Sequence, residues 1–136
     1  MKKVFVLLFI LLFGCCFSFA AEIKHQIDIE EEKCIASSHV YDYPACSQKA
    51  EKAWDNEIQK NLKLLKKVMT NDEYKAVEQM NEAWKKSVHS EIDVINRFIS
   101  NKDGIINQTT GCSHTANLKK QYALLLSSIY FTYTES

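Results

Sequence analysis

Residues 46–73 read CSQKAEKAWDNEIQKNLKLLKKVMTNDE, and this stretch decides the fold. Apolar residues recur in it at steps of three and four, which is the spacing of one face of an amphipathic α-helix. The stripe consists of Cys46, Ala50, Ala53, Trp54, Ile58, Leu62, Leu65 and Met69. Directly after it, Thr70 and Glu73 form a capping-box pattern, which predicts the start of another helix. Because the connection is so short, the sequence predicts two long antiparallel helices.

A second apolar stripe follows and defines the later of these two helices. It consists of Tyr74, Val77, Trp84, Val88, Ile92, Ile95 and Phe98. A cluster of Asn, Asp and Gly after residue 100 predicts its end. Residues 101–115 are polar and contain Gly104 and Gly111, so we expect a loop there. A last helix, from about Thr115 to Tyr130, is expected to close the groove between the two long helices.

Upstream, the chain predicts a shorter helix and a turn. Asp28 and Glu31 have capping-box spacing, so we expect a helix from Asp28 to about Ser38. Pro44 fixes its own φ, restrains the residue before it and is well tolerated in the first turn of a helix. The first long helix is therefore predicted to begin at Pro44.

The composition supports an all-α fold. The 136 residues include three Gly and one Pro, too few turn-forming residues for a sandwich or barrel of many short strands. The predicted architecture is a small helical bundle with a long central antiparallel helix hairpin plus two shorter helices. Residues 21–136 have the size of one small domain.

The first twenty residues have the pattern of an export signal. Lys2 and Lys3 are followed by the apolar run Val4–Phe13 and by small residues at Ser18 and Ala20, so cleavage is expected after Ala20. The protein is then periplasmic or secreted. Leu12 to Cys15 also matches a lipobox, in which a lipidated Cys15 would make the protein an envelope lipoprotein and give it its membrane contact. An uncleaved membrane anchor is the third possibility.

Three cysteines remain after cleavage, namely Cys34, Cys46 and Cys112. Outside the cytoplasm disulfides persist, so one pair is expected and one cysteine is left over. Closing the Cys34–Cys46 loop would stabilise by about 3 kcal/mol and closing Cys46–Cys112 by about 4 kcal/mol, a difference too small to choose between them. We predict the Cys34–Cys46 disulfide because its loop is local. Cys112 is then a free thiol, or it bridges two chains.

Nothing in the sequence has the pattern of a catalytic, metal or cofactor site. No two of the four histidines lie three or four residues apart on a predicted helix, and no CxxC or HExxH motif occurs. No Gly-rich phosphate loop or nucleophile elbow is present. After cleavage the chain has 15 basic and 17 acidic residues, so its formal net charge is −2. This charge does not fit a nucleic-acid-binding protein. We therefore predict a non-enzymatic protein with no cofactor and no metal.

Several positions together resemble the lysozyme inhibitor LprI-like family of small exported bacterial proteins. Two early cysteines about a dozen residues apart match Cys34 and Cys46. Family positions along the helices correspond to Asp55, Ile58 with Gln59, Leu62, the segment Asn81-Glu82-Ala83-Trp84, and Cys112, Lys120 and Leu124. The chain departs from the family at Ile92, where many members carry a cysteine. This departure leaves Cys112 without the partner that the family would supply.

The resemblance implies an exported binding protein that inhibits a lysozyme-type cell-wall hydrolase by occluding its cleft. The partner would be a protein, a lysozyme or another peptidoglycan hydrolase, and residues 101–115 are the expected contact because loops on rigid scaffolds carry recognition. The alternative is a periplasmic immunity protein that neutralises a secreted cell-wall amidase or toxin. A structural envelope lipoprotein is a third candidate, and the sequence leaves the oligomeric state open.

Overall fold

A computed structural model describes residues 24–135 of the chain. The predicted signal peptide at residues 1–20, its cleavage after Ala20 and the alternative lipid attachment at Cys15 lie outside the described residues. The elements in chain order are α2 (Gln26–Ser37), the 3-10 turn η1 (Val40–Asp42), α3 (Tyr43–Val68), α4 (Asn71–Ile95), the π-helical turn η2 (Asn96–Ser100) and α5 (Ile105–Glu135). The predicted all-α class is confirmed. In this part of the chain, no helix has the length and apolar character that a membrane span requires.

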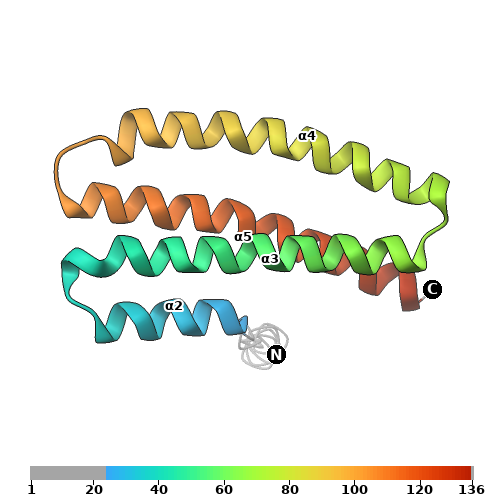
Figure 1. Ribbon diagram of the computed structural model, residues 1–136, viewed down its shortest axis with the longest axis horizontal. Helices are drawn as coiled ribbons and strands as arrows, with labels where there is room; N and C mark the ends of the chain where they lie inside the picture. The colour runs from blue at the N-terminus through green and yellow to red at the C-terminus, as the bar shows by residue number, and fades with distance from the viewer. Residues whose placement is uncertain (1–23, 136) are drawn as a thin grey trace, which may run out of the picture.

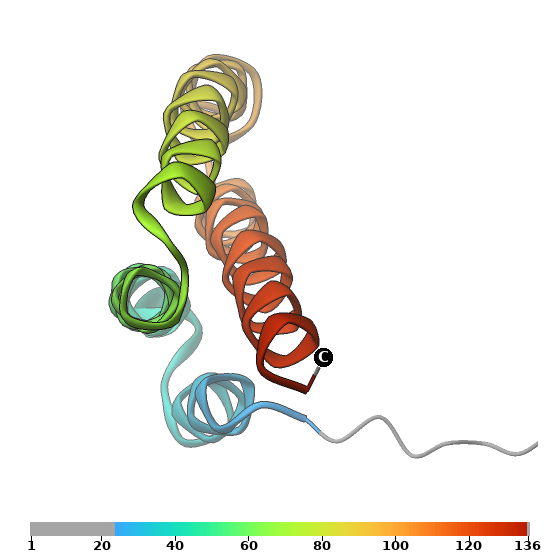
Figure 2. The same ribbon diagram turned by 90° about the vertical axis from the view of Figure 1, so that its right-hand side faces the viewer.

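The helices form three layers. The α3–α5 pair lies in the middle, α4 covers one side of it, and the short α2 covers one half of the other side (Figures 1 and 2). The α2–α3 turn and the α4–α5 connection lie at the same end of the bundle (Figure 1). The Cys34–Cys46 disulfide joins α2 to α3 at this end, with the two Cα atoms 5.7 Å apart, which confirms the predicted pairing.

The closest packing is between α3 and α5, which make the most extensive contact of any two described elements. Small residues are buried along both helices, namely Ser47, Ala50, Gly111, Ala116 and Ala123. Since the distance between packed helices depends on the side chains at the contact, these residues let the two backbones approach. The Nδ2 of buried Asn61 donates to the carbonyl of Ala123 at 3.0 Å and fixes the register of the pair.

The apolar core lies between these two helices, with Trp54, Leu65 and Leu126 almost completely buried. Helix α4 joins this core through large side chains. Trp84 of α4 stacks on Tyr122 of α5, with ring centroids 4.0 Å apart and planes at 6°. The Tyr122 hydroxyl also donates to Asn81 at 3.3 Å. Large rings at this contact explain why α4 packs less closely on α5 than α3 does.

Because of Tyr122, the bundle should become less stable at alkaline pH. Burial away from water disfavours the phenolate and raises the pKa of Tyr122 from 10.0 to about 12. Between these values the unfolded chain loses the proton that the folded chain keeps, so the free energy of unfolding should fall as pH rises. The full loss is about 2 to 3 kcal/mol. Urea unfolding across this range should show the decline, and Tyr122→Phe should make it shallower. An equal decline in the phenylalanine variant would contradict the assignment to Tyr122.

The predicted capping box at the start of α4 is confirmed. The Thr70 hydroxyl accepts from the backbone N–H of Glu73 at 3.4 Å, and the Glu73 carboxylate accepts from the backbone N–H of Thr70 at 2.9 Å. Tyr133, near the end of α5, donates to the same carboxylate at 2.8 Å. The hydrogen bonds from Thr70, followed by that from Tyr133, lower the pKa of Glu73. One cap therefore joins the start of α4 to the end of α5.

Two predictions about helix boundaries are wrong. The loop expected over residues 101–115 is confined to 101–104, because α5 begins at Ile105 and, with 31 residues, is the longest helix rather than a shorter one. At the other end, α2 begins at Gln26 and not at Asp28. His25 caps it by accepting from the backbone N–H of Ile27 at 3.2 Å, while Asp28 pairs with Lys120 at 2.8 Å.

Candidate binding site at one end of the bundle

Four exposed residues, Asn101–Gly104, connect η2 to α5 and form what we call the tip. Gly104 has a φ of +108°, a conformation that L side chains rarely adopt, and it lets the chain reverse before α5. The backbone N–H groups of Asn101 and Lys102 donate to Asn96 and Ile99, both at 3.1 Å. The tip is therefore short and exposed, and its backbone is hydrogen-bonded to the preceding turn η2.

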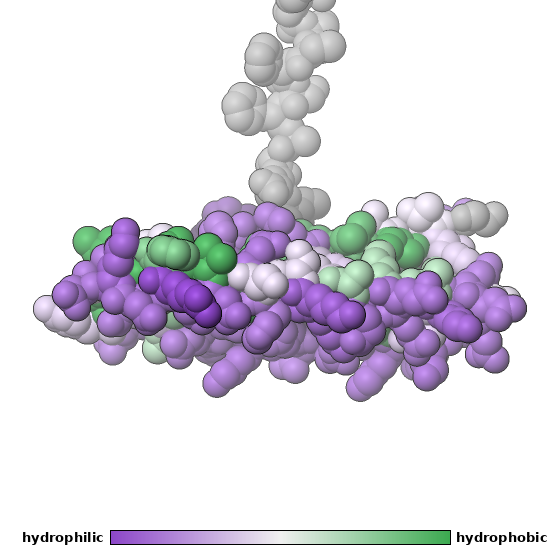
Figure 3. Space-filling view, turned by 90° about the horizontal axis from the view of Figure 1, so that it is seen from above, coloured by the Kyte–Doolittle hydropathy of each residue, from purple (hydrophilic) through white to green (hydrophobic). Residues whose placement is uncertain are grey.

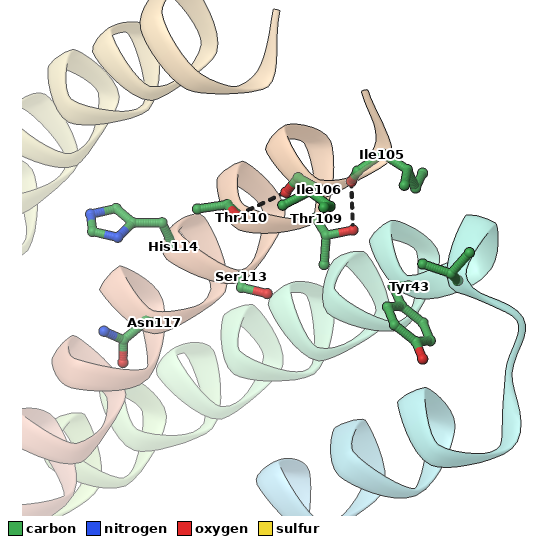
Figure 4. Close-up of a pocket in the computed structure, with 9 residues that line it drawn as sticks. Tyr43, Ile105, Ile106, Thr109, Thr110, Ser113, His114 and Asn117 are labelled. Carbon is green, nitrogen blue, oxygen red and sulfur yellow. Dashed lines mark hydrogen bonds between the residues drawn. The ribbon is translucent and has the colours of Figure 1, made fainter. Parts of the chain in front are cut away.

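Beside the tip, a cavity of about 510 Å³ opens between η1, the start of α3 and the first turns of α5 (Figure 4). We call it the end pocket. It is lined by Val40, Tyr43, Ile105, Ile106, Thr109, Thr110, Ser113, His114 and Asn117. None of these residues is Asp, Glu, Lys or Arg, although 25% of the whole chain is charged. Figure 3 shows two groups of hydrophobic residues on a largely hydrophilic face, and one of them lies at this end.

The threonine and serine hydroxyl groups of the end pocket already have hydrogen-bond partners. Thr109 and Thr110 each donate to the backbone carbonyl four residues earlier at 2.8 Å, as the dashed lines in Figure 4 show. The hydroxyls of Ser113 and Ser47 are hydrogen-bonded to each other at 2.9 Å. Among the described residues, the polar groups of the lining that have no hydrogen-bonded partner are the Tyr43 hydroxyl, the His114 ring and the Asn117 amide.

Cys112 lies on another side of α5, in a shallow pocket with Gln48 and Ile92. It is the one free thiol in the described part of the chain, and Gln48 donates to its sulfur at 3.7 Å. Ile92, the position at which the sequence departs from the LprI-like pattern, lines the same pocket as Cys112.

Ion pairs hold the middle of α5 against α3 and α2. The Lys119 ammonium donates to Asp55 at 2.6 Å and to Glu51 at 2.7 Å. Burial alone would lower the pKa of Lys119, but the hydrogen bonds to Asp55 and Glu51 and the negative charges of these two carboxylates together outweigh it and raise that pKa. The Lys120 ammonium pairs with Asp28 of α2 and lies 5.9 Å from the centre of the Trp54 ring. Both lysines join α5 to a neighbouring helix.

The residues that carried the family resemblance do not gather at one surface. Ile58 and Leu62 are buried in the core, Asp55 and Lys120 are in ion pairs, and Trp84 stacks in the α4–α5 contact. Ala83 and Leu124 are exposed on different helices. In this structure most of these residues stabilise the bundle.

The end pocket was only partly foreseen from the sequence. The lining residues between positions 105 and 115 fall within residues 101–115, the segment predicted to contact a partner protein. Val40, Tyr43 and Asn117 were not predicted. The signal that could have indicated the pocket is the pair Ile105 and Ile106 directly after Gly104, because apolar residues are unexpected in a polar loop. Across residues 24–135, no group of three or more His, Cys, Asp or Glu side chains could hold a metal ion.

Comparisons of the chain with protein-family models, with curated proteins and with solved structures give no match.

Proposed function

We propose that this is an exported, non-catalytic binding protein that inhibits a lysozyme-type cell-wall hydrolase by inserting its tip into the enzyme's substrate cleft. The tip is the observation that supports this most directly. It is a four-residue connection of exposed residues at the end of the bundle, and two of its backbone N–H groups are hydrogen-bonded. A short connection held in this way loses little conformational freedom on binding, so more of the contact energy contributes to affinity.

The tip carries two exposed charged residues, Lys102 and Asp103, and of these the lysine suits a glycosidase cleft. Such enzymes use a pair of carboxyl groups that flank the glycosidic bond. Lys102 is exposed at the tip, and its ammonium can pair with an ionised carboxylate of the cleft. Asn101 adds an amide group that can donate and accept hydrogen bonds, as the sugar hydroxyl groups of a glycan do. We propose that the tip occupies the glycan site and neutralises the carboxylate that the enzyme needs.

A cell-wall clearing assay with purified mature protein tests the proposal. Clearing by a lysozyme should slow as the protein is added, and Lys102→Ala should weaken inhibition at least tenfold, about 1.4 kcal/mol. Lys63→Ala is the matched control, because it removes the same charge from an exposed position on α3. Unchanged clearing at a large molar excess of the unmodified protein would reject inhibition of that enzyme.

The immunity-protein alternative predicts a different partner. The immobilised mature protein would then retain one cell-wall amidase or toxin tightly from envelope extract and ignore lysozymes. Retention of a lysozyme that is lost with Lys102→Ala supports inhibition through the tip. Retention of an amidase, unaffected by that substitution, supports the alternative.

A further inference from the structure

We propose that the end pocket binds a small uncharged molecule with an apolar body of one or two rings and one hydrogen-bonding group. This goes beyond the proposed inhibition and does not depend on it, since the pocket and the tip consist of different residues. A cavity of about 510 Å³ lies within the range that small-molecule sites occupy, roughly 300 to 1,000 Å³.

The walls of the end pocket are mainly apolar. Val40, Ile105 and Ile106 contribute aliphatic side chains, and Tyr43 contributes a ring. Thr109 and Thr110 use their hydroxyl protons on their own helix, so each can still offer the pocket its methyl group. An apolar body therefore covers carbon surface without removing a hydrogen bond from any of these groups.

Charge selects the class of molecule. No Asp, Glu, Lys or Arg side chain lines the end pocket, so an ionic ligand would lose hydration without gaining a counter-charge from any of these residues. A neutral ligand does not have this cost. One polar group can still be satisfied, because the side chains of His114 and Asn117 project to the same side of α5 and no described residue hydrogen-bonds either of them (Figure 4).

The walls are also fixed in place before any ligand arrives. Val40 lies within the loop that the Cys34–Cys46 disulfide closes. The Ser47–Ser113 hydrogen bond joins α3 to α5 at 2.9 Å beside the pocket. Fixed walls reduce the ordering cost of binding, which matters most for a small ligand with little contact energy.

Three probes with the same ring test the proposal, namely benzyl alcohol, benzoate and benzylammonium. We expect benzyl alcohol to produce saturable shifts in the amide NMR signals of the pocket lining, and the two ions to bind at least tenfold more weakly. Equal shifts with all three probes, or shifts at exposed apolar residues throughout the protein, would overturn the proposal. So would the absence of saturation with benzyl alcohol at millimolar concentration.

A matched pair of substitutions on α5 locates the site. Ile106 and Leu125 are 75% and 48% exposed, so an aspartate at either position should leave the fold intact, which thermal unfolding checks. Ile106→Asp should abolish benzyl alcohol binding, whereas Leu125→Asp should not change it. Equal effects of the two variants would contradict binding in the end pocket. If pocket signals shift with protein concentration alone, a second copy is the occupant and the proposal is wrong.

Discussion

Trp54→Ala is expected to lower the free energy of unfolding by about 4 kcal/mol, because Trp54 is the largest of the fully buried side chains among the described residues. Trp54 is 1% exposed on α3 and lies where three helices meet. Its ring is 4.6 Å from the ring of His25, which caps α2, and the Lys120 ammonium of α5 lies 5.9 Å from its centre. An alanine would leave a cavity that backbones held by a disulfide and ion pairs cannot close.

Urea unfolding followed by circular dichroism measures this loss, because the bundle is almost entirely helical and ΔG falls linearly with denaturant. Leu125→Ala is the control. It also shortens an apolar side chain, but at a position that is 48% exposed, so a change within about 0.5 kcal/mol is expected. A loss below about 1 kcal/mol for Trp54→Ala would show that this side chain does not hold the three helices together.

The sequence predicts α3 and the start of α4 well because the information is local. The stripe from Cys46 to Met69 repeats with helical spacing over many turns, and most of it is buried. The Thr70–Glu73 cap needs only residues three apart. Nothing in the stripe states which helix it packs against. The predicted central hairpin is therefore correct in connectivity, while the closest partner of α3 is α5.

The start of α5 was missed because its residues favour turns when taken singly. Thr109, Thr110 and Thr115 each donate a hydroxyl to the carbonyl four residues earlier, so they do not compete with the helical hydrogen bonds. Gly111 costs helix stability in isolation, but it is buried on α5, where a small residue favours close packing with α3. Tertiary contacts outweigh these local preferences.

The end pocket depends on contacts between distant parts of the chain, so the sequence alone could not define it. Val40 and Tyr43 meet Ile106 and Asn117 only because α5 packs on α3 over its whole first half. That packing depends in turn on small residues whose partners lie more than sixty positions away, such as Ser47 and Ser113. The cysteine pairing was predictable because its loop is short.

Removing the disulfide with the double substitution Cys34→Ser and Cys46→Ser is expected to lower the free energy of unfolding by about 3 kcal/mol. The effect should fall first on α2, since none of its residues is fully buried. Without the disulfide, α2 is held by the Asp28–Lys120 ion pair and by partly buried Ile27, which packs against the core. Amide hydrogen exchange should therefore lose protection across α2 while α3 and α5 remain protected.

Cys112→Ser provides the matched control for this double variant. It also replaces a thiol-bearing residue by serine, but the Cys112 sulfur accepts only a long hydrogen bond from Gln48, so stability should change by less than about 0.5 kcal/mol. Val40 follows α2 in the loop that the disulfide closes, so the double variant should also bind benzyl alcohol more weakly in the end pocket. If α2 keeps its full protection in the double variant, packing and the ion pair hold this helix, and the disulfide contributes mainly by restricting the unfolded chain.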